Sequence, residues 1–133
     1  MSTLHSLRVF VVDDEPVIAT TLALILMAKG YSAKSFTDPF VSLEAAATDK
    51  PDILIADITM PNLSGIQLAV KMREMYPEIH VLLVSGLVSV RDQLADVQMQ
   101  GRDFEVVIKP VHPEVLLSKV EAFSRRSAAA AQD

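Results

Sequence analysis

Val9-Phe10-Val11-Val12-Asp13-Asp14 is the first of several short apolar runs that each end on a polar residue. Three more follow along the chain: Ile53-Leu54-Ile55-Ala56-Asp57, Val81-Leu82-Leu83-Val84-Ser85 and Val106-Val107-Ile108-Lys109-Pro110. Apolar runs of this length are typical of strands buried on both faces of a parallel sheet. The functional crevice of such a sheet lies outside the carboxyl ends of its strands. We therefore expect carboxylates, a hydroxyl group and an ammonium group to converge there.

Helix signals alternate with these runs along the whole chain. A more polar second strand is expected over residues 31–35, at or near an edge of the sheet. The predicted helices cover about 16–28, 39–48, 66–75, 90–100 and 113–124. This alternation predicts an α/β fold of the (βα)₅ type, a doubly wound five-stranded parallel sheet with helices on both faces.

Length and composition indicate one globular domain. Half of the 133 residues are apolar and 22% are charged. We expect the domain to cover residues 1–126 and a disordered tail to cover 127–133. The net charge of −5 disfavours direct nucleic-acid binding, and the longest uncharged run is too short to span a membrane. The absence of cysteine excludes disulfides and thiolate metal sites, and it is compatible with a cytoplasmic location.

The predicted cluster of Asp13, Asp14 and Asp57 has the chemistry of a cation site. Crowded carboxylates repel one another unless a cation binds, and one or two carboxylates with several retained waters describe a Mg²⁺ site. A carboxylate can also act as a covalent nucleophile and form an aspartyl phosphate. Mg²⁺ and Lys109 would neutralise the transferring phosphoryl group, and the hydroxyl of Ser85 could donate a hydrogen bond to it.

From residue 8 to about residue 123, the chain resembles the receiver domains of two-component response regulators. The resemblance rests on four motifs in register: Val12-Asp13-Asp14-Glu15-Pro16, Ala56-Asp57-Ile58-Thr59-Met60-Pro61-Asn62-Leu63-Ser64-Gly65, Val84-Ser85-Gly86 and Ile108-Lys109-Pro110. Any one motif would be weak, but the four in this order are specific. The resemblance implies a CheY-like, flavodoxin-like three-layer sandwich. It also implies a phosphoryl donor, either a histidine kinase or a histidine phosphotransfer protein, and an unknown downstream protein target.

The resemblance assigns the acidic residues. Asp57 would be the phosphoacceptor. Asp14 and Asp57 would be direct Mg²⁺ ligands together with the backbone carbonyl of Thr59, and Asp13 would act through water. Such a domain is not an enzyme towards a separate substrate, because it catalyses only its own phosphorylation and dephosphorylation.

The resemblance also assigns the switch and phosphate-binding positions. Ser85 would supply the switch hydroxyl and Lys109 would contact the phosphate, with a bond to Pro110 that is often cis in the family. The sequence departs from the family pattern at Val106, where an aromatic switch residue is usual, and Phe104 would point to the same side of the strand nearer its start. The segment from Ser85 to Lys109 is also a residue or two longer than the common pattern. These departures affect the usual switch and not the phosphorylation chemistry.

The helix expected over residues 16–28 carries apolar residues on two faces. The inward stripe consists of Ile18, Leu22, Ile25 and Leu26, and the outward strip consists of Val17, Thr21, Leu24 and Ala28. A crossover helix packed on one sheet face cannot be buried all round, so the outward strip should be exposed. In the receiver family this helix commonly docks the phosphodonor histidine domain. The strip therefore predicts either partner docking or dimerisation, with the chain a monomer or a weak homodimer.

Two other functions compete with a phosphorylatable receiver. A pseudo-receiver would use the same fold as a pure interaction domain, but the intact acidic pair, acceptor, hydroxyl and lysine disfavour it. A flavodoxin-like or hydrolase enzyme is disfavoured because no glycine-rich phosphate loop follows the first strand and no nucleophile elbow occurs.

The residues expected beside the acyl phosphate predict its lifetime. In receivers, the residues two past the acceptor and two past the hydroxyl flank the path of the hydrolytic water, and here they are Thr59 and Leu87. Neither can act as a general base or orient water through an amide. We expect slow self-dephosphorylation.

Overall fold

The computed structural model describes residues 7–86 and 104–131 and contains one five-stranded parallel sheet. The strand order is β2-β1-β3-β4-β5, so the second strand lies at an edge, as its polar sequence predicts. The strands are β1 (Arg8–Val12), β2 (Ser32–Phe36), β3 (Ile53–Asp57), β4 (His80–Ser85) and β5 (Glu105–Ile108).

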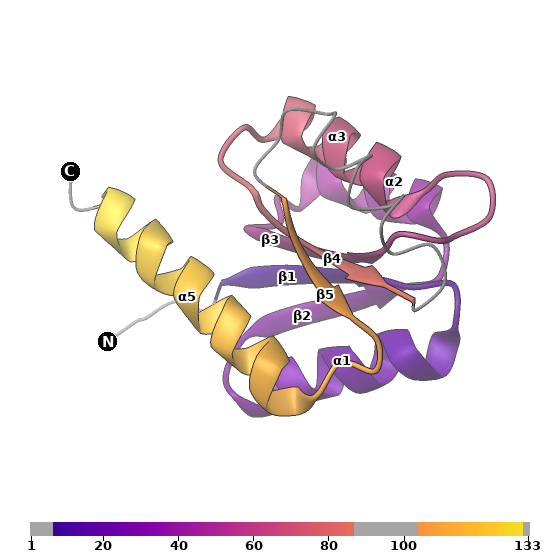
Figure 1. Ribbon diagram of the computed structural model, residues 1–133. Helices are drawn as coiled ribbons and strands as arrows, with labels where there is room; N and C mark the ends of the chain where they lie inside the picture. The colour runs from indigo at the N-terminus through magenta and orange to yellow at the C-terminus, as the bar shows by residue number, and fades with distance from the viewer. Residues whose placement is uncertain (1–6, 87–103, 132–133) are drawn as a thin grey trace.

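Helices cover both faces of this sheet, which confirms the doubly wound, three-layer architecture (Figure 1). The described helices are α1 (Pro16–Ala28), α2 (Pro39–Thr48), α3 (Gly65–Met75) and α5 (Pro113–Ala131). α2 and α3 lie on one face of the sheet, and α1 and α5 lie on the other. The helix predicted over residues 90–100 lies outside the described residues. Among the described helices, none has both the length and the apolar character needed to cross a bilayer.

Each face of the sheet has its own hydrophobic core, because successive side chains of a strand point to opposite faces. Phe10, Leu54 and Leu83 pack with α2 and α3. Their strand neighbours Val9 and Ile53 pack with α1 and α5. The central strands are buried on both faces, and this is why they appear in the sequence as continuous apolar runs.

Local sequence signals fix where α3 begins. The Ser64 hydroxyl accepts a hydrogen bond from the Gln67 backbone N–H (3.1 Å), and the Gln67 side-chain oxygen accepts one from the Ser64 N–H (3.0 Å). This capping box satisfies two donors that the first helical turn would otherwise leave without partners. The capping box starts α3 close to the end of β3, eight residues after Asp57.

The last helix is longer than predicted. The sequence predicts its end near residue 124 and disorder over 127–133, whereas α5 continues to Ala131. Alanine has the highest helix propensity, so the alanine-rich end extends the helix. Side chains also tie this turn to the sheet, because Ser127 Oγ lies 2.9 Å from His80 Nε2 and Arg126 contacts Glu105 at 3.3 Å. The domain limit at residue 126 stays a prediction.

Candidate functional site

The three predicted carboxylates meet at the carboxyl ends of β1 and β3. Asp13 and Asp14 follow β1 directly, and Asp57 is the last residue of β3. From β1 the chain turns outward to the edge strand β2 and then returns to β3 on the other side of β1. Ligand sites of doubly wound sheets lie where the chain reverses in this way. The convergence predicted for the carboxylates from the strand-end pattern is therefore confirmed.

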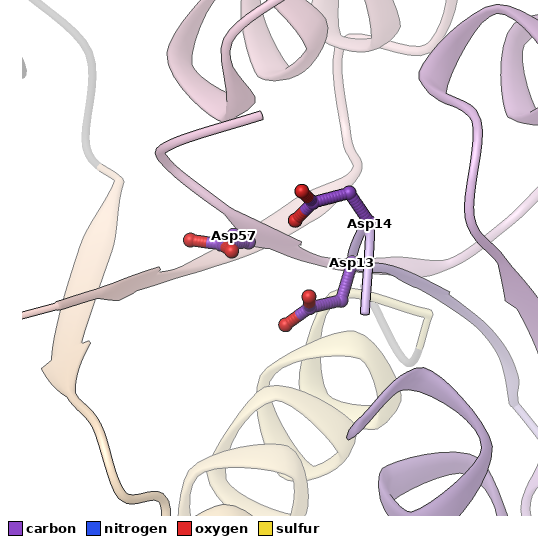
Figure 2. Close-up of side chains that lie close together, drawn as sticks. All are labelled: Asp13, Asp14 and Asp57. Carbon is purple, nitrogen blue, oxygen red and sulfur yellow. The ribbon is translucent and has the colours of Figure 1, made fainter. Parts of the chain in front are cut away.

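Three carboxylates from these two strand ends form one cluster. Asp13, Asp14 and Asp57 each offer an oxygen atom, and these atoms all lie within 4.8 Å of one another. Figure 2 shows the three side chains gathered in one place, with Asp13 and Asp14 on one strand end and Asp57 on the other. Asp13 and Asp57 are 2% and 5% exposed, while Asp14 faces solvent. Hard oxygen ligands with one side open to water fit a Mg²⁺ ion that keeps several of its waters.

Lys109 brings a positive charge to the same cluster from the end of β5. Its Nζ atom lies 3.0 Å from Asp57 Oδ2 and 3.3 Å from Asp13 Oδ2. The Lys109–Pro110 peptide bond is cis, as the resemblance implies. A third partner, Glu15 Oε1, lies 3.7 Å away and is not predicted from the sequence as a site residue. Its place directly after the acidic pair is the signal that could have identified it.

Burial and neighbouring charges shift the pKa values of both Asp57 and Lys109. Burial raises the pKa of Asp57, and the negative charge of Asp13 raises it further, against the opposing effect of Lys109. Burial alone would lower the pKa of Lys109, but its hydrogen bond to Asp57 and the charges of Asp57 and Asp13 raise the pKa overall. A buried carboxylate beside a second carboxylate is therefore costly to keep ionised. A bound divalent cation would offset this cost.

Hydrogen bonds with the backbone hold the Asp57 carboxylate and the Ser85 hydroxyl in place. The Thr59 N–H donates to Asp57 Oδ1 at 3.2 Å, which orients the Asp57 carboxylate. Ser85 is fully buried at the end of β4, and its hydroxyl donates to the Gly86 carbonyl at 3.0 Å. The Lys109 N–H donates to the Ser85 carbonyl at 2.8 Å, so the ends of β4 and β5 are joined.

The loop after β3 needs a residue without a side chain at position 65. A Cβ atom on Gly65 would lie 2.3 Å from the Asp57 carbonyl oxygen and 2.9 Å from the Ile58 Cα atom. The Gly65 N–H donates to the Ile58 carbonyl at 2.9 Å. Gly65 thus lets the start of α3 approach the backbone of Asp57. The sequence identifies Gly65 as part of a motif, but not this close approach.

Val106 and Phe104, two positions earlier, pack on the same core. Phe104 is buried and Val106 is half-buried against the cluster shared with α2 and α3, so the prediction that both point to one side of the strand is confirmed. The Arg73 guanidinium lies 5.3 Å from the centroid of the Phe104 ring. Leu87, expected beside the phosphoryl group, lies outside the described residues.

The apolar outward strip of α1 is exposed, as predicted. Val17 is 77% exposed and Leu24 is 57% exposed, while Thr21 and Ala28 also face solvent. Leu22 and Leu26 are buried against the sheet, in agreement with the predicted inward stripe. An apolar groove of about 300 Å³ lies beside the strip, and it is lined by Ile18, Thr21, Leu22, Lys109, Pro110 and Val111.

Comparisons with known proteins identify the family. Residues 9–121 match the family described as the response regulator receiver domain. The chain is 32% identical over 119 residues to a probable transcriptional regulatory protein, TcrX, of Mycobacterium tuberculosis, covering 90% of this chain and 50% of TcrX. It is 30% identical over 122 residues to the response regulator MprA of Mycobacterium bovis, covering 92% of this chain and 52% of MprA. The chain thus spans about half the length of these curated relatives.

Solved structures share the fold. The chemotaxis protein CheY4 of Vibrio cholerae superposes with a TM-score of 0.80 at 22% sequence identity, covering 89% of this chain and 98% of CheY4. At this level of identity the likeness concerns the fold alone. The shared fold is that of the five-stranded parallel sheet described above.

Proposed function

Because the chain belongs to the response regulator receiver domain family, we propose that it accepts a phosphoryl group on Asp57 in a two-component phosphorelay. The donor would be a histidine kinase or a histidine phosphotransfer protein. The observation that carries this proposal is the buried Asp57 carboxylate, which lies 3.0 Å from the Lys109 ammonium group and within 4.8 Å of carboxylate oxygens of Asp13 and Asp14. An acceptor, a cation site and a fixed positive charge are the parts that phosphoryl transfer needs.

The reaction we propose is a direct transfer between two side chains. An oxygen of Asp57 attacks the phosphorus of a phosphohistidine, the P–O bond forms and the P–N bond breaks, and the departing imidazole keeps the electron pair. Lys109, whose Nζ atom lies 3.0 Å from Asp57 Oδ2, would stabilise the negative charge on the phosphoryl oxygens. The N–H of Thr59 holds the carboxylate in one orientation.

The same carboxylates would hold Mg²⁺. We assign Asp14, Asp57 and the Thr59 backbone carbonyl as direct ligands, with Asp13 acting through water. When bound, Mg²⁺ would neutralise part of the charge on the acceptor and on the phosphoryl group. Because Asp14 is the exposed member of the cluster, it can bind the ion without the loss of a buried hydrogen bond.

Ser85 and Lys109 would report the phosphorylated state. The Ser85 hydroxyl now donates to the Gly86 carbonyl, and on phosphorylation we propose that it turns to donate to a phosphoryl oxygen. The Lys109 N–H bond to the Ser85 carbonyl would pass this change to β5. The signal would then leave through a protein surface to a downstream protein target. The proposal implies a cytoplasmic location, with which the cysteine-free sequence is compatible.

Incubation with acetyl phosphate and Mg²⁺, followed by intact-mass measurement, tests the proposal. The wild-type protein should gain the mass of one phosphoryl group, and Asp57→Ala should gain none. Asp52→Ala is the matched control, because Asp52 lies at the opposite end of β3. An adduct that persists in Asp57→Ala would contradict the assignment of the acceptor.

A pseudo-receiver is the second candidate, and beryllofluoride separates it from a true receiver. A true receiver should bind beryllofluoride tightly in the presence of Mg²⁺, because this ion imitates the phosphoryl group on Asp57. A pseudo-receiver should neither bind it nor gain the acetyl phosphate adduct.

A further inference from the structure

Helix α1 presents an exposed apolar face that nothing in the described chain covers. All 13 residues of the helix are uncharged, whereas most surface helices carry charges on their outer face. Val17 and Leu24 are more than half exposed, and Met27 is 45% exposed. Single exposed apolar residues are normal on a protein surface, but here several lie together on one helix face.

The strip on α1 is complementary to itself in an antiparallel arrangement. The four residues of the strip are spaced by four, three and four positions, as are the residues at the interface of a coiled coil. They are Val17, Thr21, Leu24 and Ala28. When a second α1 runs in the opposite direction, Val17 of one copy meets Ala28 of the other, and Thr21 meets Leu24. The same register pairs all four positions at once, as an isologous twofold contact requires.

Charges at the two ends of α1 favour the same arrangement. Acidic residues precede the helix, including Glu15, which is largely exposed, and Lys29 follows it. Within the described residues, Lys29 makes no ion pair. An antiparallel pair would bring each Lys29 towards the acidic end of its partner, and it would also oppose the two helix dipoles. A parallel pair would instead place the two acidic ends together.

We propose that a second copy of this chain covers the strip, with the two α1 helices packed antiparallel. Two helices of this length bury less area than a stable permanent dimer needs, so the dimer is weak and depends on protein concentration. The strip adjoins the apolar groove that Lys109 and Pro110 help to line, because Thr21 belongs to both.

Sedimentation of the full chain over a concentration series up to about 1 mM tests self-association. The average mass should rise with concentration for the wild type, and Leu24→Glu should remain monomeric with an unchanged thermal transition. Phe40→Glu is the matched control, because Phe40 is an exposed apolar residue on α2, on the other side of the sheet. A wild-type chain that stays monomeric throughout overturns the proposal and leaves a different protein as the occupant of the strip.

Charge substitution tests the role of the helix ends. Lys29→Glu should raise the dimer dissociation constant several-fold, since the two symmetry-related contacts are both lost. Lys71→Glu changes the net charge equally, but it lies on α3, on the opposite sheet face, and should have no effect. Equal effects of the two substitutions would show that overall charge, and not this contact, governs association.

Cysteine crosslinking tests the direction of the helices, because the chain has no native cysteine. Val17 and Ala28 are about 16 Å apart along one helix, and in an antiparallel pair they face each other. A mixture of the Val17→Cys and Ala28→Cys chains should therefore form a disulfide-linked heterodimer, and either chain alone should crosslink poorly. Efficient crosslinking of Val17→Cys with itself would indicate parallel helices and would overturn the antiparallel arrangement.

Discussion

Among single residues, Lys109 is proposed to contact the phosphoryl group but not the metal ion. A substitution of Lys109 can test these two statements separately. Its Nζ atom contacts Asp57 and Asp13, but an ammonium group cannot be a metal ligand. Lys109→Ala should therefore leave Mg²⁺ affinity nearly intact and weaken beryllofluoride binding roughly ten- to hundredfold, the value of a charged hydrogen bond. Titration monitored by thermal denaturation measures both affinities. Lys119→Ala is the control, because Lys119 pairs with Glu105 away from the cluster.

The lifetime of the acyl phosphate also depends on single residues. Thr59 holds Asp57 through its backbone N–H, and its side chain offers no general base for an attacking water. Leu87 has the same limitation and would cover the phosphoryl group with apolar surface. We expect decay over minutes to hours, with a shorter lifetime in Thr59→Asn and in Leu87→Asn. Intact-mass measurements over time follow the decay, and complete loss within seconds in the wild type would show that shielding is absent.

At the scale of elements, the join between β3 and α3 permits a test of packing. A methyl group at position 65 would overlap the Asp57 carbonyl, whereas one at position 86 would meet no atom of the described residues within 4 Å. Gly65→Ala should lower the free energy of unfolding by about 1–3 kcal/mol, and Gly86→Ala should change it by less than about 0.5 kcal/mol. Urea denaturation measures both values. Equal stability of the two variants would show that the loop moves aside without cost.

Strand ends were predictable from the sequence because burial on both faces leaves a clear pattern. An apolar run stops where the chain leaves the sheet, so Asp57, Ser85 and Lys109 could each be placed at a strand end. Helix starts were predictable where capping residues and proline mark them. The end of α5 was not, because an alanine run near a terminus favours a helix locally but can equally fray. Its contacts with His80 and Glu105 are tertiary and leave no local signal.

At the scale of the whole molecule, the order of the strands decides which charges meet. The sequence predicts that polar residues share one edge of the sheet, but it does not give their distances. The contact between Glu15 and Lys109 depends on side chains that reach across the ends of several strands. The exposure of the α1 strip follows from the same topology, because α1 packs on one sheet face and leaves its outer face in solvent.

The acidic cluster should also limit the stability of the whole domain. Asp13 and Asp57 are buried close together, so a divalent cation that binds only the folded state should stabilise it. At ten times its dissociation constant, Mg²⁺ should add about 1.4 kcal/mol, which raises Tm by roughly 4–7 °C for a domain of this size. Asp14→Asn should lose most of this rise, while Asp52→Asn, at the other end of β3, should keep it. Calorimetry with and without Mg²⁺ measures the difference, and an equal rise in both variants would mean that the ion binds elsewhere.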